Sequence, residues 1–159
     1  MADIKITDIM SKNVVSVNPE MPLFEAAKIL ADHNFDGVPV IDKDNKLVGI
    51  LTEYDLISKG SAIHLPTFQK LLKEIGVFGK DKSHFKKEFQ DVISLKVKDT
   101  MNADPLTLKD SVTYEEVVET FREHHRVNPI PVVDQSGRVV GVVSRFDVLK
   151  PLRSVDNEP

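Results

Sequence analysis

The sequence predicts an α/β fold built from two similar repeats, each with the order strand, helix, strand, strand, helix. Three observations predict it: the chain repeats part of itself, each copy contains the pattern of a β-hairpin, and each copy carries an apolar helical stripe before that hairpin. A unit of about 55 residues buries too little surface to be stable alone. We therefore expect the repeats to pack as a pseudo-two-fold pair of small mixed sheets with helices on one side.

The repeat is most evident in two matching segments. VPVIDKDNKLVGILTEYDLI, from Val38, matches IPVVDQSGRVVGVVSRFDVL, from Ile130, at a spacing of 92 residues. Asp-x-Met starts precede them, ending at Met10 and Met101, which we expect to be core residues. The boundaries that follow are 6–58 for the first repeat, 59–96 for an inserted segment, 97–150 for the second repeat and 151–159 for a C-terminal tail.

The first strand and helix of each repeat have local signals. Val14 to Val17 is a β-branched run that Asn18-Pro19 ends, and Pro105 to Leu108 is its equivalent. Apolar residues then recur at helical spacing, with Pro22 suited to the first turn of the first helix and a Thr113–Glu116 capping box before the second. The stripes are Leu23, Ala26, Ala27 and Leu30 in one copy and Val117, Val118 and Phe121 in the other.

A hairpin and a last helix complete each repeat. Apolar runs from Val38 to Ile41 and from Lys46 to Leu51 flank Asp42-Lys43-Asp44-Asn45, and Asp-Gln-Ser-Gly occupies that place in the second copy. The last helix is expected to begin after Thr52 or Ser144.

The inserted segment 59–96 has no counterpart in either repeat. Its apolar residues predict an amphipathic helical hairpin. We expect its apolar stripes to cover the surface of the pair or a second subunit, and a lid over a ligand cleft is the alternative. The stripes are Phe68, Leu71, Leu72 and Ile75, then Phe85, Phe89, Val92 and Ile93.

Composition and motifs argue against several classes of protein. The net charge of −4 disfavours nucleic-acid binding. No apolar run approaches the roughly 20 residues that cross a bilayer, and no signal-peptide pattern is present, so we expect a cytoplasmic location. The chain has no cysteine, and the adjacent His124 and His125 lack a credible third ligand, so no metal site is expected. No nucleophile or phosphate-loop motif is present, so we expect no catalytic residues and no enzymatic activity.

Two motifs, GILTEYD from Gly49 to Asp55 and GVVSRFD from Gly141 to Asp147, share the pattern Gly, two apolar residues, Ser or Thr, two variable residues, Asp. With the preceding VPV and IPV and the Asp-x-Met starts, they resemble cystathionine β-synthase (CBS) domains. The chain, apart from segment 59–96 and its tails, resembles a stand-alone CBS pair. The resemblance implies a regulatory module and homodimer that binds AMP, ADP, ATP or S-adenosylmethionine, requires no cofactor and acts on a separate regulated protein.

The resemblance also implies the roles of individual residues. Asp55 and Asp147 would accept hydrogen bonds from ribose hydroxyls, and Thr52 and Ser144 would meet a phosphate at a helix start with free N–H groups. Arg145 would add a cation beside Ser144. His124, His125 and Arg126 precede the second slot, whereas Asn34, Phe35 and Asp36 precede the first, so the second half is better equipped for a polyphosphate. If only one cleft binds, the cleft with Asp147 and Arg145 is preferred. The adenine slot would be lined by Ser16, Val38, Pro39, Thr107, Ile130 and Pro131.

Two alternatives remain open on the sequence alone. Thr52 to Asp55 and Ser144 to Asp147 also fit the capping box of a helix, and capping and ligand binding can coexist. The chain could also be an assembly scaffold with empty clefts.

Overall fold

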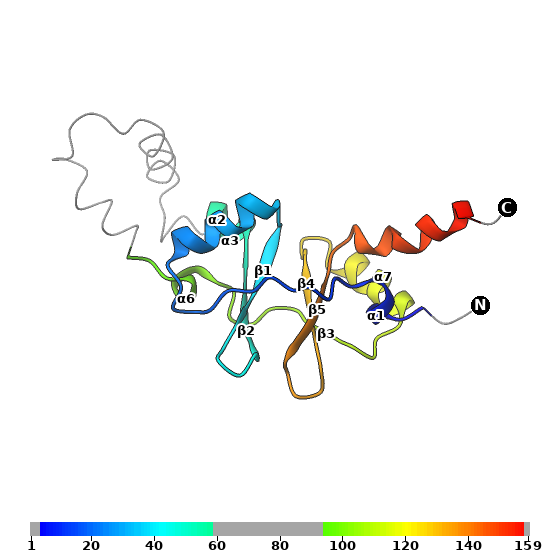
Figure 1. Ribbon diagram of the computed structural model, residues 1–159, viewed down its shortest axis with the longest axis horizontal. Coiled ribbons are helices and arrows are strands. Elements are labelled where there is room, and N and C mark those ends of the chain that lie inside the picture. Colours follow the sequence, from blue (N-terminus) through cyan, green and yellow to red (C-terminus); the bar gives the residue numbers. More distant parts are fainter. Residues whose placement is uncertain (1–3, 59–93, 158–159) are drawn as a thin grey trace, which may run out of the picture.

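The computed structural model describes residues 4–58 and 94–157 (Figure 1). The first repeat contains α1 (Ile6–Ile9), α2 (Leu23–His33), β1 (Gly37–Ile41), β2 (Leu47–Thr52) and α3 (Glu53–Ser58). The second contains α6 (Val97–Thr100), β3 (Leu108–Lys109), α7 (Tyr114–Glu123), β4 (Ile130–Val133), β5 (Val139–Val143) and the 3₁₀ helix η1 (Asp147–Asn157). The predicted helical hairpin lies, apart from residues 94–96, outside the described residues.

Each repeat has its own small sheet, as expected. β1 and β2 form an antiparallel hairpin, and β4 and β5 form its equivalent, to which β3 adds in parallel. The strand predicted at 14–17 is only a single parallel bridge between Val17 and Val40, and its equivalent is the two-residue β3. Asn18-Pro19 follows Val17 directly, and because proline has no N–H the ladder does not continue beyond the bridge at Val17. The mixed α/β architecture is confirmed, with shorter first strands than predicted.

The helices before the hairpins begin where the sequence predicts. α2 starts after Pro22 and ends at His33, and Asn34 caps it in the left-handed conformation at φ 53°. α7 starts after Thr113, whose side chain accepts from the N–H of Glu116 while the Glu116 carboxylate accepts from the N–H of Thr113. The predicted capping box is therefore confirmed. η1 runs beyond residue 150 to Asn157 and contains Pro151.

The leading segment of each repeat packs into the core of the other. α1 places Ile6 and Ile9 in a core otherwise formed by the second repeat, and α6 places Val97 in a core otherwise formed by the first. One core contains Ile6, Ile9, Met10, Leu108, Val117, Phe121, Ile130, Val132 and Val143; the other contains Val17, Leu23, Ala26, Leu30, Val38, Val40, Leu51 and Val97. Neither repeat, as the sequence delimits it, has a complete core.

Backbone bridges hold these exchanged segments. Ser11 pairs with Val142 on β5, and Asn102 pairs with Ile50 on β2. Met10 is 8% exposed in one core, and Met101 packs partly buried against the other, so their predicted core role is confirmed.

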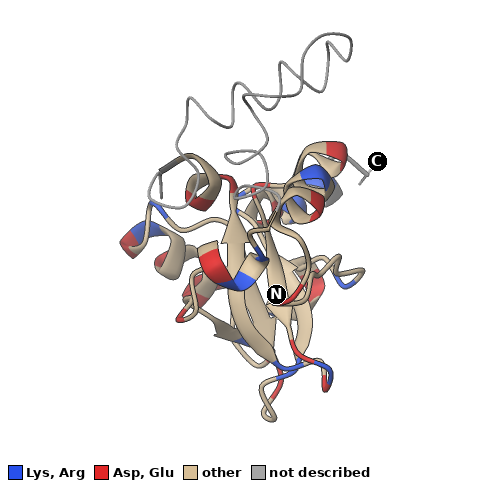
Figure 2. Ribbon diagram, turned by 90° about the vertical axis from the view of Figure 1, so that its left-hand side faces the viewer, with Lys and Arg blue, Asp and Glu red and all other residues tan. Residues whose placement is uncertain are grey.

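The two hairpins lie side by side and join at their turns (Figure 1). The N–H of Leu47 donates to the carbonyl of Gly137 at 3.1 Å, and that of Val139 donates to Asn45 at 3.1 Å. Charged residues lie at the hairpin turns (Figure 2). Lys46 and Arg138, which pair between the two turns, are both exposed. The pair is thus connected at the turns as well as through its cores.

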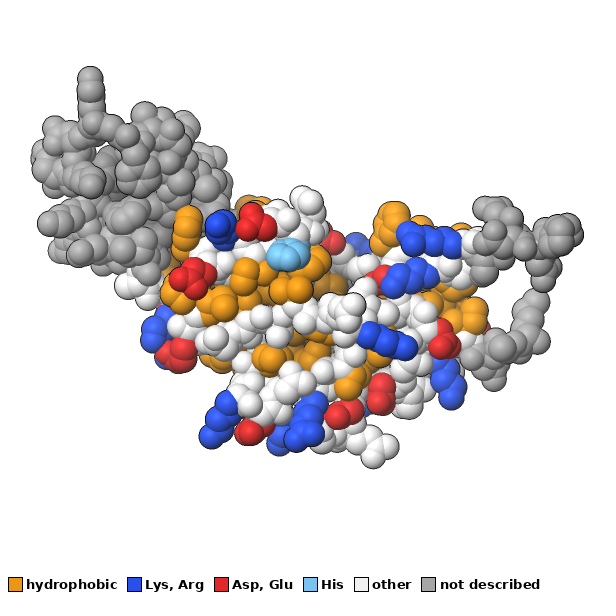
Figure 3. Space-filling model, viewed as in Figure 1, with side chains coloured by type: hydrophobic (Ala, Val, Ile, Leu, Met, Phe, Trp, Pro, Cys, Tyr) orange, Lys and Arg blue, Asp and Glu red, His pale blue; other side chains and the backbone are white. Residues whose placement is uncertain are grey.

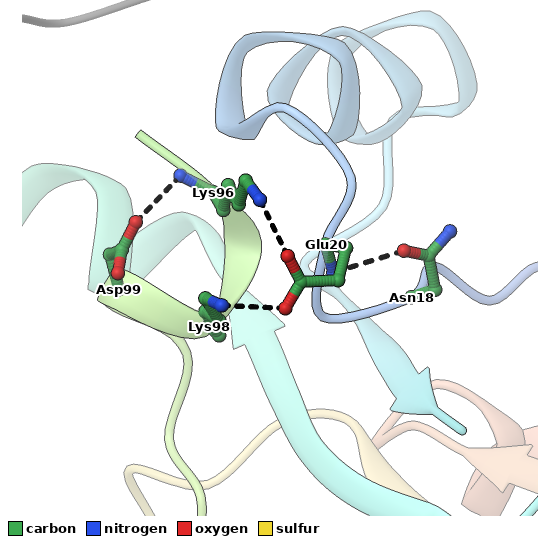
Figure 4. A network of polar contacts seen from close by, with 5 residues as sticks. All are labelled: Asn18, Glu20, Lys96, Lys98 and Asp99. Atoms are coloured by element: carbon green, nitrogen blue, oxygen red, sulfur yellow. Dashed lines mark hydrogen bonds and ion pairs between the residues drawn. The ribbon is translucent and has the colours of Figure 1, made fainter. Parts of the chain in front are cut away.

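A surface ion cluster ties α6 to the loop before α2 (Figure 4). The Glu20 carboxylate binds the ammonium groups of Lys96 and Lys98 at 2.5 and 2.6 Å. These hydrogen bonds lower the pKa of Glu20 from 4.5 to about 2.

Among the described helices, none is long and apolar enough to cross a bilayer.

Candidate functional site

Two pockets lie between the repeats, and each takes residues from both. We call them the Asp147 pocket, of about 320 Å³, and the Asp55 pocket, of about 370 Å³. The Asp147 pocket is lined by Ser11, Asn13, Val14, Val15, Asn34, Phe35, Asp36, Gly37, Val38, Pro39, Pro129, Val142, Ser144, Phe146 and Asp147. The Asp55 pocket is lined by Ile50, Thr52, Glu53, Tyr54, Asp55, Asn102, Pro105, Leu106, Arg126, Val127, Asn128 and Pro129.

The two pockets are equivalent under the internal repeat. Most lining positions in one pocket lie 91 or 92 residues from a lining position in the other. The pairs are Ser11 and Asn102, Val14 and Pro105, Val15 and Leu106, Asn34 and Arg126, Phe35 and Val127, Asp36 and Asn128, Gly37 and Pro129, Val142 and Ile50, Ser144 and Thr52, Phe146 and Tyr54, Asp147 and Asp55. Differences between the pockets are therefore differences in side chains at matched positions.

Each motif aspartate is buried against the start of its own helix. The Asp55 carboxylate accepts from the N–H of Thr52 at 3.0 Å and from its hydroxyl at 2.7 Å. The Asp147 carboxylate accepts from the N–H and hydroxyl of Ser144 at 2.7 and 2.9 Å. Asp55 is 6% exposed and Asp147 is 8% exposed. The capping box is confirmed at Thr52, whose hydroxyl also accepts from the N–H of Asp55 at 3.2 Å, and α3 begins after Thr52 as expected. In the second motif the N–H of Asp147 donates to the carbonyl of Ser144, and η1 begins at Asp147 rather than directly after Ser144, so only the carboxylate half of the box forms there. Both carboxylates still border the pockets.

The residue that follows Thr52 or Ser144 in each motif also donates a hydrogen bond from its backbone N–H. The N–H of Glu53 donates to the Asp36 carbonyl at 3.0 Å, and that of Arg145 donates to the side-chain oxygen of Asn128 at 3.0 Å. The expectation of free N–H groups for a phosphate is therefore wrong at these positions, because the cap and the neighbouring loop already take them.

Arg145 does not reach the Asp147 pocket, contrary to expectation. Its guanidinium donates to the carbonyls of His125 and Val127 and lies 6.0 Å from the centre of the Phe121 ring. The guanidinium thus meets carbonyl oxygens just beyond the end of α7, and a cation is stabilised there.

Asp147 meets a different cation. The ammonium of Lys150 binds the second oxygen of Asp147 at 2.7 Å and also donates to the carbonyl of Ile9. The second motif is thereby linked to α1.

The residues expected around adenine divide into two groups. Val38 and Pro39 line the Asp147 pocket, on the strand that pairs with β2. Ser16, Thr107, Ile130 and Pro131 are not among the lining residues of either pocket. Ile130 points into a core and is fully buried, so its side chain does not line a cleft.

A pair of polar residues joins the two pockets. The amide of Asn128, in the Asp55 pocket, donates to the Asp36 carboxylate, in the Asp147 pocket, at 2.6 Å. Pro129 follows Asn128 through a cis peptide bond and lines both pockets. Asp36 and Asn128 were not predicted as site residues, although both lie just before a recognised hairpin.

Arg126 and Glu53 give the Asp55 pocket charges of both signs. Arg126 precedes β4, yet it lines the pocket of Asp55 rather than that of Asp147. Partial burial raises the pKa of Glu53, and the nearby carboxylates of Asp36 and Asp55 add to the rise.

Within residues 4–58 and 94–157, no cluster of three His, Asp or Glu side chains could hold a metal ion.

Comparison with known proteins shows the family of this chain and several proteins similar to it. The family model described as CBS domain matches residues 6–61 and 97–154. Inosine-5'-monophosphate dehydrogenase of Methanocaldococcus jannaschii is 28% identical over 146 residues, which are 92% of this chain and 23% of that protein. This chain therefore spans less than a quarter of the length of that relative.

Two solved structures are similar over nearly the whole chain. The crystal structure of CBSX2 from Arabidopsis thaliana in complex with AMP has a TM-score of 0.71 and 25% identity, covering 97% of this chain and 99% of that one. The CBS domain of a CBS domain-containing membrane protein from Sphaerobacter thermophilus has a TM-score of 0.70 and 30% identity, covering 93% and 87%.

Proposed function

Because this chain belongs to the CBS domain family and carries two CBS domains in tandem, we propose that it is a sensor that binds an adenosine-type ligand between its repeats and acts on a separate protein. One observation carries the proposal: two equivalent pockets each combine a buried aspartate with an apolar wall. A carboxylate accepts hydrogen bonds from a ribose diol, and apolar side chains accommodate a base.

The capped aspartates retain the capacity to bind ribose. A carboxylate offers about four acceptor sites. Asp55 and Asp147 use one oxygen each for the N–H and hydroxyl of the motif Thr or Ser, and the second oxygen of Asp147 also binds the ammonium of Lys150, so a ribose would share that carboxylate with Lys150. Because the cap holds each carboxylate in place, a ribose would meet an acceptor that is already oriented.

AMP is the first ligand to test, because CBSX2, which is similar over nearly the whole chain, has been solved in complex with AMP. ADP, ATP and S-adenosylmethionine share the adenosine group and belong to the same proposal. The adenine would lie against Val38 and Pro39 in one pocket and against Pro105 and Leu106 in the other. The proposed role is binding without chemical change, and it requires no cofactor.

The signal would arise from differential affinity. A ligand that prefers one arrangement of the two repeats shifts the population toward that arrangement. Pro129 and the Asp36–Asn128 hydrogen bond lie in the wall between the pockets, so a ligand in either pocket touches the join between the repeats. We propose a cytoplasmic homodimer as the form that a regulated protein would recognise.

Thermal unfolding with and without AMP, ADP, ATP and S-adenosylmethionine tests the proposal. A ligand at 100 times its dissociation constant adds about 2.7 kcal/mol to the free energy of unfolding, which raises the midpoint by roughly 5–10 °C. Asp55→Ala and Asp147→Ala each remove one carboxylate, so each is expected to reduce the ligand-induced shift. Thr113→Ala is the matched control, because it also removes a helix cap but lies outside both pockets.

A second candidate function is an assembly scaffold. It is favoured by the hydrogen bonds that already occupy the hydroxyl and the first two N–H groups of each motif without a ligand. The absence of a shift with all four ligands, in protein free of adenine absorbance, would support the scaffold and contradict the sensor.

A further inference from the structure

We propose that the two pockets bind different forms of the adenosine ligand: the Asp55 pocket binds a phosphorylated form through Arg126, and the Asp147 pocket binds a form without phosphate. This inference rests on the proposed function and assigns a ligand class to each pocket. It follows from side chains at matched positions in two pockets of otherwise equivalent construction.

Two matched positions make the Asp55 pocket more positive. Arg126 stands where the Asp147 pocket has Asn34, and Asn128 stands where it has Asp36. At each of these two positions the residue in the Asp55 pocket is more positive by one unit of charge than its match in the Asp147 pocket. The carboxylate of Asp36 lines the Asp147 pocket and would repel a phosphate there. In the Asp55 pocket the neutral amide of Asn128 occupies the matched position and donates to that carboxylate at 2.6 Å.

A phosphate needs donors that the motifs do not offer. The hydroxyl of Thr52 donates to Asp55, and the hydroxyl of Ser144 donates to Asp147. The N–H groups of Glu53 and Arg145 are also taken. A charged donor elsewhere in the pocket is therefore decisive for an anion.

Arg126 is such a donor, and the Asp147 pocket has no equivalent. Arg126 is exposed and makes no ion pair or hydrogen bond within the part of the chain that the structure describes. The described lining of the Asp147 pocket contains neither Lys nor Arg, because Arg145 binds carbonyls near the end of α7 and Lys150 pairs with Asp147. A guanidinium without a protein partner can bind a phosphate with two parallel hydrogen bonds.

Glu53 opposes this role, since its carboxylate lines the same pocket as Arg126. Removing the charge of Glu53 should therefore strengthen binding of a phosphate, whereas removing that of Arg126 should weaken it. Opposite effects from two residues of one pocket are not expected from a general disturbance of the fold.

The experiment compares AMP with adenosine, which differ only in the phosphate, by calorimetric titration of the full chain. Arg126→Gln is expected to weaken AMP binding about 10-fold or more, since it removes a charge-assisted contact, and to leave adenosine affinity within about twofold. Arg126→Lys should restore part of the AMP affinity, and Glu53→Gln should increase it. The matched control is Arg122→Gln, on α7, where Arg122 pairs with Glu119 outside both pockets.

A competition titration tests the Asp147 pocket. Protein saturated with AMP is expected to bind adenosine still, at a site that Asp147→Ala weakens and Arg126→Gln leaves intact. Complete exclusion of adenosine by AMP would overturn the assignment of two ligand classes.

Other outcomes separate the inference from the proposed function. AMP affinity that Arg126→Gln leaves unchanged, or equal losses for AMP and adenosine, would overturn the role of Arg126 while leaving the sensor in place. If neither AMP nor adenosine binds the wild-type chain, the sensor fails for these ligands and the inference fails with it.

Discussion

The sulfur of Met101 packs directly on Gly49, the first residue of the motif in the other repeat. A Cβ added at Gly49 would lie 2.8 Å from that sulfur and 2.8 Å from the carbonyl oxygen of Asn102. The matched contact joins Met10 to Gly141, where an added Cβ would also collide with the methionine. Each motif glycine is thus required by the segment that the other repeat contributes.

Replacing Gly49 by alanine is expected to lower the free energy of unfolding by about 1–3 kcal/mol, because the new methyl overpacks against Met101 and the Asn102 backbone. Urea unfolding measures the change. In a double-mutant cycle, Met101→Ala should recover part of the loss, since the sulfur is one of the two close contacts.

Gly137→Asn is the control for this prediction. Gly137 has a φ of 83° and nothing within 4 Å of an added Cβ, and asparagine tolerates the left-handed region better than other residues. Its replacement is expected to cost less than that of Gly49. An equal cost at both positions would contradict the role of the close contact with Met101, because among the two glycines only Gly137 has a positive φ.

We expect the stability of the fold to depend on the ionisation of Glu20 at acid pH. Because Lys96 and Lys98 lower its pKa from 4.5 to about 2, the stabilisation that it contributes is complete above pH 4.5 and is lost as the pH falls to about 2. Glu20→Gln is expected to flatten the dependence of stability on pH in that window, and added salt should weaken the wild-type effect.

The control for acid sensitivity is Glu25→Gln. Glu25 lies exposed on α2 and makes no ion pair among the described residues. Some acid dependence will remain in every variant, because the N–H of Lys46 lowers the pKa of Asp42 and the hydroxyl of Ser136 lowers that of Asp134. The same flattening in both Glu variants would contradict the role of the lysine pair.

Asn128 should stabilise the junction between the repeats. Asn128→Ala removes the 2.6 Å hydrogen bond to Asp36 and the acceptor for the N–H of Arg145, so we expect a loss of about 1–2 kcal/mol at this partly exposed site. A cycle with Asp36→Ala measures the coupling between the two side chains, and an additive result would exclude it. Asn13→Ala, at an exposed position, should change stability by less than about 0.5 kcal/mol.

The proposed homodimer has a candidate surface on the last helix of each repeat. Ile57 on α3 and Leu149 on η1 occupy matched positions and are 58% and 49% exposed. Figure 3 shows that apolar side chains also gather across one face of the pair. Ile57→Ser with Leu149→Ser is expected to shift the chain toward monomer in sedimentation velocity, since neither residue lines a pocket.

Val118→Ser on α7 is the control for the dimer, because Val118 is 37% exposed and lies on another helix. A wild-type chain that sediments as a monomer would contradict the proposed homodimer. A dimer that survives the double substitution would place its interface elsewhere.

The elements that the sequence predicted well depend on local chemistry. Both hairpins, the Thr113–Glu116 capping box and the start of α2 after Pro22 need only residues close in the chain. The family resemblance is confirmed by the match to residues 6–61 and 97–154.

The elements that were missed depend on contacts between the repeats. Sequence similarity assigned α1 to the first repeat, whereas its apolar side chains lie in the core of the second. The direction of Arg145 is set by the carbonyls of His125 and Val127, which a motif pattern does not reveal. Arg126 is adjacent in sequence to one hairpin and lines the pocket of the other motif, because each pocket combines the two repeats.

The exchange of α1 and α6 makes the two halves complementary fragments. A half comprising residues 4–58 would carry α1 without the hydrophobic cavity that receives Ile6 and Ile9, and its own core would lack Val97. A half comprising residues 94–157 would have the reciprocal defect. Two such polypeptides, expressed together, would each supply the other's missing piece, so the unit with complete cores is the pair and not the repeat.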